Sequence, residues 1–119
     1  MEEYAIIVAG GKGSRMNQEL PKQFIELRGQ PILMHTLRQF YRANAAINIV
    51  LVLPEAQRAY WQQLVTQHTF NIPHQVVSGG KSRFQSVKNG LAAITPLDGL
   101  VAIHDGVRPF ISEMIIKKS

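Results

Sequence analysis

Three loops hold the residues that could do chemistry in this sequence. They are AGGKGSRM at residues 9–16, SGGKSRFQS at 78–86 and HDGVRPF at 104–110, and each follows a short apolar run. In doubly wound folds, ligands bind beyond the carboxyl ends of the strands. We therefore expect these loops to form the ligand-binding edge of a sheet.

The first loop fits neither of the two standard phosphate-binding motifs. The dinucleotide fingerprint G-x-G-x-x-G matches Gly11 and Gly13 but meets Met16 at its last position. A Walker A loop requires G-x-x-x-x-G-K-[ST], and neither this loop nor residues 80–82 satisfy it. What remains is a flexible glycine loop whose backbone N–H groups can face an anion.

Two basic side chains strengthen that interpretation. Arg15 and Lys22 follow the glycines at spacings that let both reach the same cluster of phosphates. The alternative is a glycine-rich turn carrying solvated basic residues, and the Pro21-Lys22 pair makes it the weaker hypothesis.

The second loop combines glycines with the start of a helix. Gly79 and Gly80 let a ligand approach the backbone closely, and Ser82 with Gln85 has capping-box spacing, which predicts a helix that starts near Ser82. The N-terminus of that helix carries a partial positive charge, and Ser86, one turn on, is expected to face the same way as Ser82. A strand-to-helix turn with a serine cap is an equally good explanation of this loop taken alone.

The third loop supplies a carboxylate. Asp105 directly follows an apolar run and is placed like a metal-binding carboxylate beside phosphates. His104 is expected to be a packed strand-end histidine, while Arg108 and Pro109 have structural explanations. Together the three loops predict a site for a nucleoside triphosphate with Mg²⁺.

The residue types also constrain the reaction. If a substrate phosphate attacks the α-phosphate, the nucleophile is already ionised and needs no general base. The protein would then supply alignment and positive charge for the phosphoryl transition state. A site rich in Arg, Lys and Asp favours this over hydrolysis by an activated water.

Composition restricts the class of protein. The chain has 119 residues, a formal net charge of +5 and no cysteine, so a thiolate metal site or nucleophile is excluded and an intracellular setting fits best. Its basic residues are scattered, which is weak support for nucleic acid. Neither a secretory signal nor an apolar run of membrane-spanning length is present. We expect a soluble cytoplasmic protein with no membrane or nucleic-acid partner.

The apolar patterns alternate between strands and helices. Short continuous runs at 4–9, 47–53, 74–78 and 100–104 predict strands covered on both faces. Helical periodicity occurs between them, and the residues expected to be buried there are Leu33, Leu37 and Phe40 in 31–44, Tyr60 and Leu64 with Trp61 and Val65 in 55–68, and Phe84, Val87, Leu91 and Ile94 in 82–94. This order predicts an α/β, Rossmann-like three-layer sandwich with a mostly parallel sheet.

The last residues, ISEMIIKKS, have the pattern expected for the beginning of another helix, with Met114, Ile115 and Ile116 as its apolar residues. We interpret residues 1–119 as a single nucleotide-binding portion of a longer catalytic domain whose C-terminal half is absent. A short terminal helix of a complete small domain is the alternative.

The motifs AGGKGSRM…PKQF, GGKSRFQSV and HDGVRP together resemble those of the nucleotidyltransferases, and among these the 2-C-methyl-D-erythritol 4-phosphate cytidylyltransferase family. They occur in the family's order and cover nearly the whole chain. The resemblance implies a Rossmann-like sheet, CTP as co-substrate, Mg²⁺ as metal, a sugar-alcohol phosphate as acceptor, pyrophosphate as by-product and a homodimer. It also implies that a fragment of this length is inactive.

The resemblance assigns roles by position. Arg15 and Lys22 would stabilise the pentacoordinate transition state, and Asp105 would lie near the ribose, triphosphate and metal. The residues implied to contact CTP are Ala9, Gly10, Gly11, Gly13, Gly80, Lys81, Ser86, Asp105 and Gly106.

The sequence departs from the family at a few positions. Val8 and Gly10 stand where proline and alanine are common, Gly106-Val107 replaces two alanines, and Lys81 occupies a position that is often acidic. The last of these puts in doubt a contact made by that side chain, but not one made by the main chain.

Two other functions stay open at this point. A sister cytidylyltransferase acting on ribitol 5-phosphate shares the CTP motifs. A non-catalytic nucleotide- or RNA-binding module is the alternative of a different class. Phe40, Tyr60 and Phe84 fall on predicted apolar helix stripes and are not interleaved with basic residues, which disfavours an RNA binder.

Overall fold

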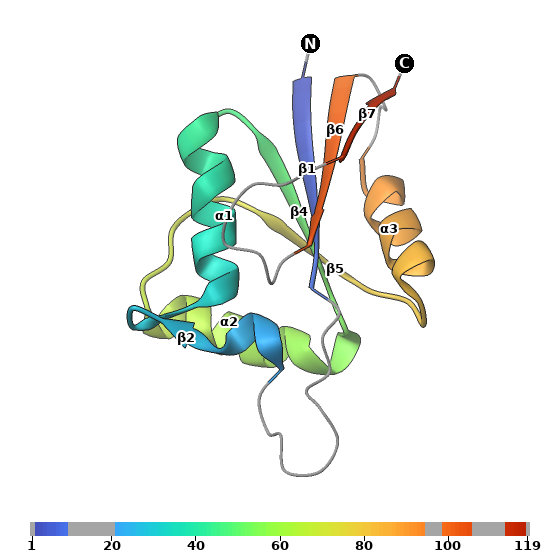
Figure 1. Cartoon of the computed structure of the whole chain (residues 1–119). Coiled ribbons are helices and arrows are strands. Elements are labelled where there is room, and N and C mark those ends of the chain that lie inside the picture. Colours follow the sequence, from blue (N-terminus) through green and yellow to red (C-terminus); the bar gives the residue numbers. More distant parts are fainter. Residues whose placement is uncertain (1, 10–20, 95–98, 106–113, 119) are drawn as a thin grey trace.

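A five-stranded sheet forms the centre of the molecule. The computed structural model describes residues 2–9, 21–94, 99–105 and 114–118. Across the sheet the strands are β5 (Gln75–Ser78), β4 (Asn48–Leu53), β1 (Glu2–Val8), β6 (Gly99–Asp105) and β7 (Met114–Lys118). The first four run parallel, and β7 pairs antiparallel with β6 (Figure 1). The order of the parallel strands, third-second-first-fourth along the chain, is that of half a Rossmann sheet.

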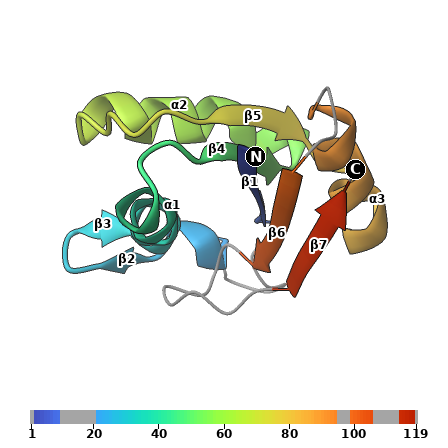
Figure 2. The same cartoon turned by 90° about the horizontal axis from the view of Figure 1, so that it is seen from above.

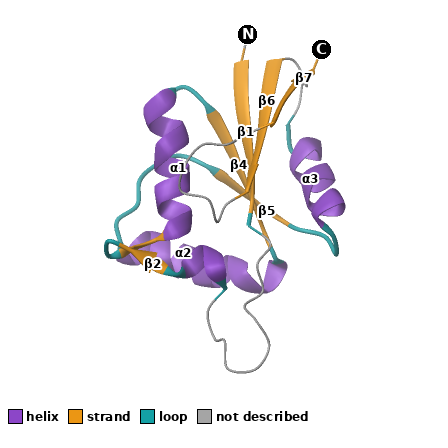
Figure 3. Ribbon diagram, viewed as in Figure 1, coloured by secondary structure: helices purple, strands orange, loops and turns teal. Residues whose placement is uncertain are grey.

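Helices cover both faces of the sheet. Helices α1 (Ile32–Ala43) and α2 (Arg58–Gln67) share a core with one face, and α3 (Arg83–Ala92) packs on the other (Figures 1 and 2). The predicted α/β three-layer sandwich with a mostly parallel sheet is therefore confirmed. Figure 3 shows the same alternation of strand and helix along the chain. In the described part of the chain, no helix combines the length and apolarity needed to cross a membrane.

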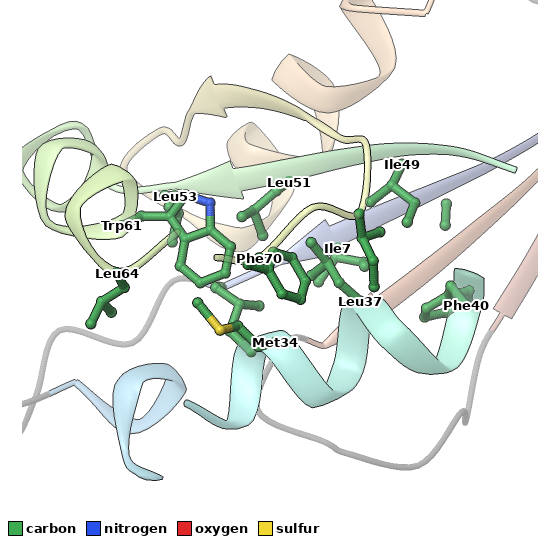
Figure 4. Close-up of a cluster of buried hydrophobic side chains, with 14 of the residues drawn as sticks. Ile7, Met34, Leu37, Phe40, Ile49, Leu51, Leu53, Trp61, Leu64 and Phe70 are labelled. Atoms are coloured by element: carbon green, nitrogen blue, oxygen red, sulfur yellow. The ribbon is translucent and has the colours of Figure 1, made fainter. Parts of the chain in front are cut away.

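The side chains of β1 and β4 divide between the two cores. Ile7 and Leu51 point to the α1 and α2 side, where they meet Leu37 and Trp61 (Figure 4). The alternate positions of the same strands supply the second core, under Val87 and Leu91 of α3. Because both faces of each strand are buried, the strand sequences are continuously hydrophobic, as the parallel arrangement requires.

A short hairpin precedes α1 and was not anticipated from the sequence. It consists of β2 (Glu26–Leu27) and β3 (Gln30–Pro31), which pair antiparallel. Arg28 and Gly29 between them have φ values of 56° and 84°. Two successive positive φ angles are typical of the tight turns that join paired strands. A pairing of two residues on each strand is too short to produce a visible alternation in the sequence.

The prediction of a helix at residues 111–119 was wrong. Residues Met114–Lys118 form β7, which runs antiparallel beside β6. Consecutive apolar residues that include two β-branched isoleucines suit a strand, and the open edge of β6 provides the backbone partners. Long-range pairing of this kind overrides a short apolar run that is compatible with either structure.

Two of the predicted buried aromatic residues are instead exposed. Tyr60 is 38% exposed and Phe84 76% exposed, whereas Trp61 is fully buried. At 3.6 residues per turn, Tyr60 lies roughly 100° from Trp61 around α2, and Phe84 roughly 160° from the buried Ser86 around α3. The other residues of these two stripes pack on the cores as predicted: Leu64 and Val65 on one side of the sheet, and Val87, Leu91 and Ile94 on the other. Only the two aromatic residues, which lie at the margin of the buried face, were placed wrongly.

Candidate functional site

The candidate site lies at the carboxyl ends of β1 and β6. Between these two strands, the direction in which the chain adds strands to the sheet reverses. Val8 at the end of β1 is paired with Asp105 at the end of β6. From β1 the chain first adds β4 and β5 on one side and then β6 on the other. Ligands of open α/β sheets bind in the crevice outside such a switch point. The first and third loops of the sequence analysis leave from this point, and the second leaves from the same edge at Ser78.

The first loop begins from a fixed backbone position. Ala9 is fully buried, and its N–H donates to the carbonyl of Val52 at 2.9 Å. The predicted nucleotide-contacting residues Gly10, Gly11 and Gly13, together with Arg15, lie outside the described residues.

Lys22 opens the short helix η1 (Lys22–Phe24), where its side chain is exposed. The next residue, Gln23, is fully buried and its Nε2 donates to the carbonyl oxygen of Ala9 at 3.2 Å. The start of η1 is therefore tied to the end of β1. The structure thus brings the neighbour of Lys22 to the switch point, although Gln23 was not identified from the sequence.

The second loop has little room for side chains. Gly79 donates its N–H to the carbonyl of Leu53 at 2.7 Å, and a Cβ at this position would lie 2.9 Å from Ser86 Oγ. A Cβ on Gly80 would collide with the side chain of Gln85. Both glycines are therefore required by the close approach of the loop to the first turn of α3.

The start of α3 is as the sequence predicted. Ser82 is the N-cap, and its Oγ accepts a hydrogen bond from the N–H of Gln85 at 3.1 Å. Ser86 does not face the same way as Ser82, because Ser82 is exposed while Ser86 is buried and accepts the N–H of Gly80 at 3.1 Å. Lys81 is exposed and directly precedes the N-cap Ser82, at a helix N-terminus that favours anions.

Side chains from two helices hold Ser78, the residue before the glycines. Asn89 of α3 donates its Nδ2 to the Ser78 carbonyl at 3.0 Å. Arg58 of α2 donates to Ser78 Oγ at 2.9 Å, and Ser78 Oγ donates in turn to the Glu55 carboxylate. That hydrogen bond is the main reason why the pKa of Glu55 is lowered. The sequence pattern did not identify this network, since its members are isolated polar residues on four separate elements: β5, η2 (Glu55–Gln57), α2 and α3.

The third loop follows β6 at Asp105, which is the last residue of the strand and half-buried. His104 is buried, and its ring packs edge-on against Phe40 with centroids 5.2 Å apart. The prediction of a packed strand-end histidine is confirmed. Gly106, Arg108 and Pro109 lie outside the described residues. Among the residues that the structure describes, no three His, Cys, Asp or Glu side chains form a metal-binding group.

A cavity of about 370 Å³ lies at the opposite edge of the sheet. Tyr4, Asn48 and Gln75, near the amino ends of β1, β4 and β5, are among the residues that line it, as are His74 and Ile94. Because the three loops leave from the carboxyl edge, this cavity is separate from the candidate nucleotide site.

Comparison with known proteins agrees with the fold and identifies a family. Residues 4–119 match the family model of 2-C-methyl-D-erythritol 4-phosphate cytidylyltransferase. A protein of that name from Bacteroides thetaiotaomicron is 51% identical over 118 residues, which cover 99% of this chain and 53% of the relative. Another from Porphyromonas gingivalis is 53% identical over 111 residues, covering 93% and 49% respectively.

Solved structures give the same result. The crystal structure of 4-diphosphocytidyl-2C-methyl-D-erythritol synthase from Anaerococcus prevotii superposes with a TM-score of 0.73 at 31% identity, covering 93% of this chain and 46% of that one. The chain spans about half the length of the curated relatives it matches. From the match of nearly every residue to the family model, and from relatives about 50% identical over the same region, this chain belongs to the 2-C-methyl-D-erythritol 4-phosphate cytidylyltransferase family.

Proposed function

We propose that the full-length protein transfers the cytidylyl group of CTP to 2-C-methyl-D-erythritol 4-phosphate in non-mevalonate isoprenoid biosynthesis. The observation that carries this proposal is the match of residues 4–119 to the family of that name. The geometry supports it, because the strands that precede the three loops all end at the same edge of the sheet.

In this reaction an oxygen of the acceptor phosphate attacks the α-phosphorus of CTP, and the bond from that phosphorus to the β-phosphate oxygen breaks. Pyrophosphate leaves with the electron pair. The attacking oxygen is already ionised at neutral pH, so the protein needs positive charge and alignment more than a base. Lys22 and Arg15 are proposed to supply that charge, and the loop that begins at Ala9 to hold the triphosphate.

The second loop is proposed to hold the base side of the nucleotide. The Oγ of Ser86 accepts a hydrogen bond from the N–H of Gly80. This hydrogen bond keeps the backbone of residues 79–80 close to the first turn of α3. Lys81 is exposed beside this turn, so its main chain, and not a particular side-chain contact, is the part that we assign to CTP.

Asp105 is the residue proposed to hold Mg²⁺. Magnesium is commonly bound by one or two carboxylates, with phosphate oxygens and waters completing its shell. A carboxylate at the end of β6, beside the switch point, fits that donor set. When bound, the ion would neutralise negative charge on the triphosphate.

The activity is tested by incubating the full-length protein with CTP, Mg²⁺ and either 2-C-methyl-D-erythritol 4-phosphate or ribitol 5-phosphate. We expect pyrophosphate release and CDP-methylerythritol with the first acceptor. Turnover of ribitol 5-phosphate alone would replace the proposed acceptor. Tight, strongly salt-dependent binding of single-stranded RNA without any response to CTP would overturn the proposal.

The roles of Lys22 and Arg15 are tested by separate substitution with alanine in the full-length protein. Charge on the reacting phosphate develops in the transition state, so each change should lower kcat far more than it weakens CTP binding. Steady-state kinetics and calorimetric titration with CTP measure the two effects. A loss confined to CTP affinity would contradict the assigned role.

A homodimer, which the family resemblance implies, and a cytoplasmic location, which the sequence composition favours, complete the proposal. Light scattering after size exclusion tests the first with the full-length protein, and cell fractionation tests the second.

A further inference from the structure

Gln23 is the polar side chain that the structure places most deeply beside the proposed triphosphate loop. It is 0% exposed, and it directly follows Lys22 in η1. Its Nε2 donates two hydrogen bonds, one to the carbonyl oxygen of Ala9 at 3.2 Å and one to Oε1 of Gln57 at 2.7 Å. A buried amide group is stable only with such partners.

These two hydrogen bonds join elements that are distant in sequence. Ala9 is the last described residue before residues 10–20, and Gln23 comes shortly after them. Gln57 belongs to η2 (Glu55–Gln57), which follows β4. One side-chain amide therefore connects the end of β1, where the first loop begins, to η1 and to η2.

The residue after Gln23 anchors the same turn on its other side. Phe24 is 2% exposed, its ring meets Tyr60 edge-on at 5.0 Å, and it stacks on Trp61 at 6.4 Å. The backbone of η1 is thus held between the end of β1 and the face of α2. Gln23 and Phe24 are both buried and held by these contacts. They therefore fix the backbone position of Lys22, the exposed residue at the start of this turn.

We propose that Gln23 is a positioning residue for cytidylyl transfer, which acts by fixing the backbone of Lys22 relative to the carboxyl end of β1. This inference rests on the proposed function. Gln23 touches no substrate in this assignment. Its contribution reaches the reacting phosphate through Lys22, so it is lost when Lys22 loses its charge.

The main test is Gln23→Met in the full-length protein. Methionine is unbranched and of similar size, so it fills the buried space while removing both donated hydrogen bonds. We expect kcat to fall by about 10- to 100-fold, because small misplacements of charged groups cost this much, with the CTP dissociation constant changed by less than about threefold.

The decisive measurement combines this change with Lys22→Ala. If Gln23 acts through Lys22, the double variant is no slower than Lys22→Ala alone. A purely structural role would instead lower kcat by a similar factor in both backgrounds, and that result would overturn the proposal. An unchanged kcat in Gln23→Met would overturn it as well.

Two further variants keep the test independent of folding. Gln57 is half-buried, and Gln57→Met removes its Oε1, which accepts one of the two hydrogen bonds from Gln23. When this change is combined with Lys22→Ala, kcat should again fall no further than in Lys22→Ala alone. Thr36→Val is a buried polar-to-apolar change in α1, where Thr36 Oγ1 donates to the carbonyl of Ile32, and it should leave kcat unchanged. If the unmutated protein releases no pyrophosphate from CTP, the proposed function has failed, whereas an active protein with additive effects rejects only the role of Gln23.

Discussion

At the scale of single residues, the hydroxyl of Ser86 links the second loop to the helix that follows. It is buried and accepts the N–H of Gly80 at 3.1 Å. Removing it leaves a backbone donor without this acceptor and lets residues 79–80 move away from α3. Residues 79–80 would then adopt several conformations, and only one of them is the conformation proposed to bind the nucleotide.

We predict that Ser86→Ala in the full-length protein weakens CTP binding about tenfold, a loss of about 1.4 kcal/mol, with a smaller effect on kcat. Isothermal titration with CTP measures the affinity. Thr66→Ala, on the exposed side of α2, is the matched control and should bind CTP normally. If the unmutated protein, Ser86→Ala and Thr66→Ala all bind CTP with equal affinity, the proposed role of Ser86 is rejected.

His74 is a second residue whose environment has a measurable consequence. Trp61 Nε1 donates to His74 Nε2 at 3.0 Å, and His74 Nδ1 donates to the carbonyl of Ile72 at 2.8 Å. The ring is therefore held in its neutral form, and burial lowers the pKa of His74 below its usual 6.5. A proton on Nε2 would displace the hydrogen bond from Trp61.

The unfolded chain binds this proton more readily than the folded one, so stability decreases as the pH falls. We predict that the free energy of unfolding is at its full value above about pH 6.5 and is lost progressively as the pH falls from there towards the lowered pKa of His74. Urea denaturation at pH 7.5 and pH 5.5 measures it. His74→Gln cannot titrate and should show a shallower decrease; equal decreases for both proteins would contradict the assignment.

At the scale of elements, the contact between α3 and the sheet depends on Gly90. A Cβ there would lie 2.8 Å from Ile6 Cγ2 and 3.1 Å from Val52 Cγ2. Both methyl groups belong to branched side chains in the buried core beneath α3, so neither can move aside easily. The glycine, unfavourable within a helix by about 1 kcal/mol, is explained by this close packing.

Gly90→Ala should therefore destabilise the protein, although alanine is the better helix former. Overpacking of a core costs about 1–3 kcal/mol, and the gain in helix propensity recovers about 1 kcal/mol of it. We expect a net loss of roughly 1 kcal/mol in urea denaturation. Lys88→Ala, at an exposed position of the same helix, should change stability little, and a more stable Gly90→Ala protein would refute the packing argument.

At the scale of the whole molecule, the two edges of the sheet have different roles. The strands that precede the three loops end at the carboxyl edge, and the cavity of about 370 Å³ is at the amino edge. The connection after β1 leads to β4 on one side and the connection after β6 leads to β7 on the other, so the switch point lies at the carboxyl ends of these strands. The proposed function therefore requires that CTP bind at the carboxyl edge and not at the amino edge.

Hydrogen exchange of the full-length protein with and without CTP and Mg²⁺ tests this requirement. We predict slower exchange at the amides of Ala9, Gly80 and Asp105, and unchanged exchange at Ile47 and Gln75 beside the amino-edge cavity. Protection that appears only at the amino edge would place the nucleotide elsewhere and contradict the proposed site.

Residue types and periodicity alone determined the alternating architecture and the three loops. Continuous apolar runs predict strands buried on both faces, and Ser82 with Gln85 predicts where α3 begins; both are local properties of the chain. The residues assigned to CTP and to Mg²⁺ also come from motifs in the sequence, and their roles stay predictions.

Tertiary structure decided the features that depend on distant partners. Met114–Lys118 is a strand because β6 offers it an edge, and Trp61 is buried in place of Tyr60 because packing selects the face of a helix. Gln23 is the clearest case. Its side-chain amide finds its partners only when folding brings Ala9 and Gln57 to within hydrogen-bonding distance. These partners lie 14 and 34 residues away along the chain, so no local sequence pattern predicts the two contacts.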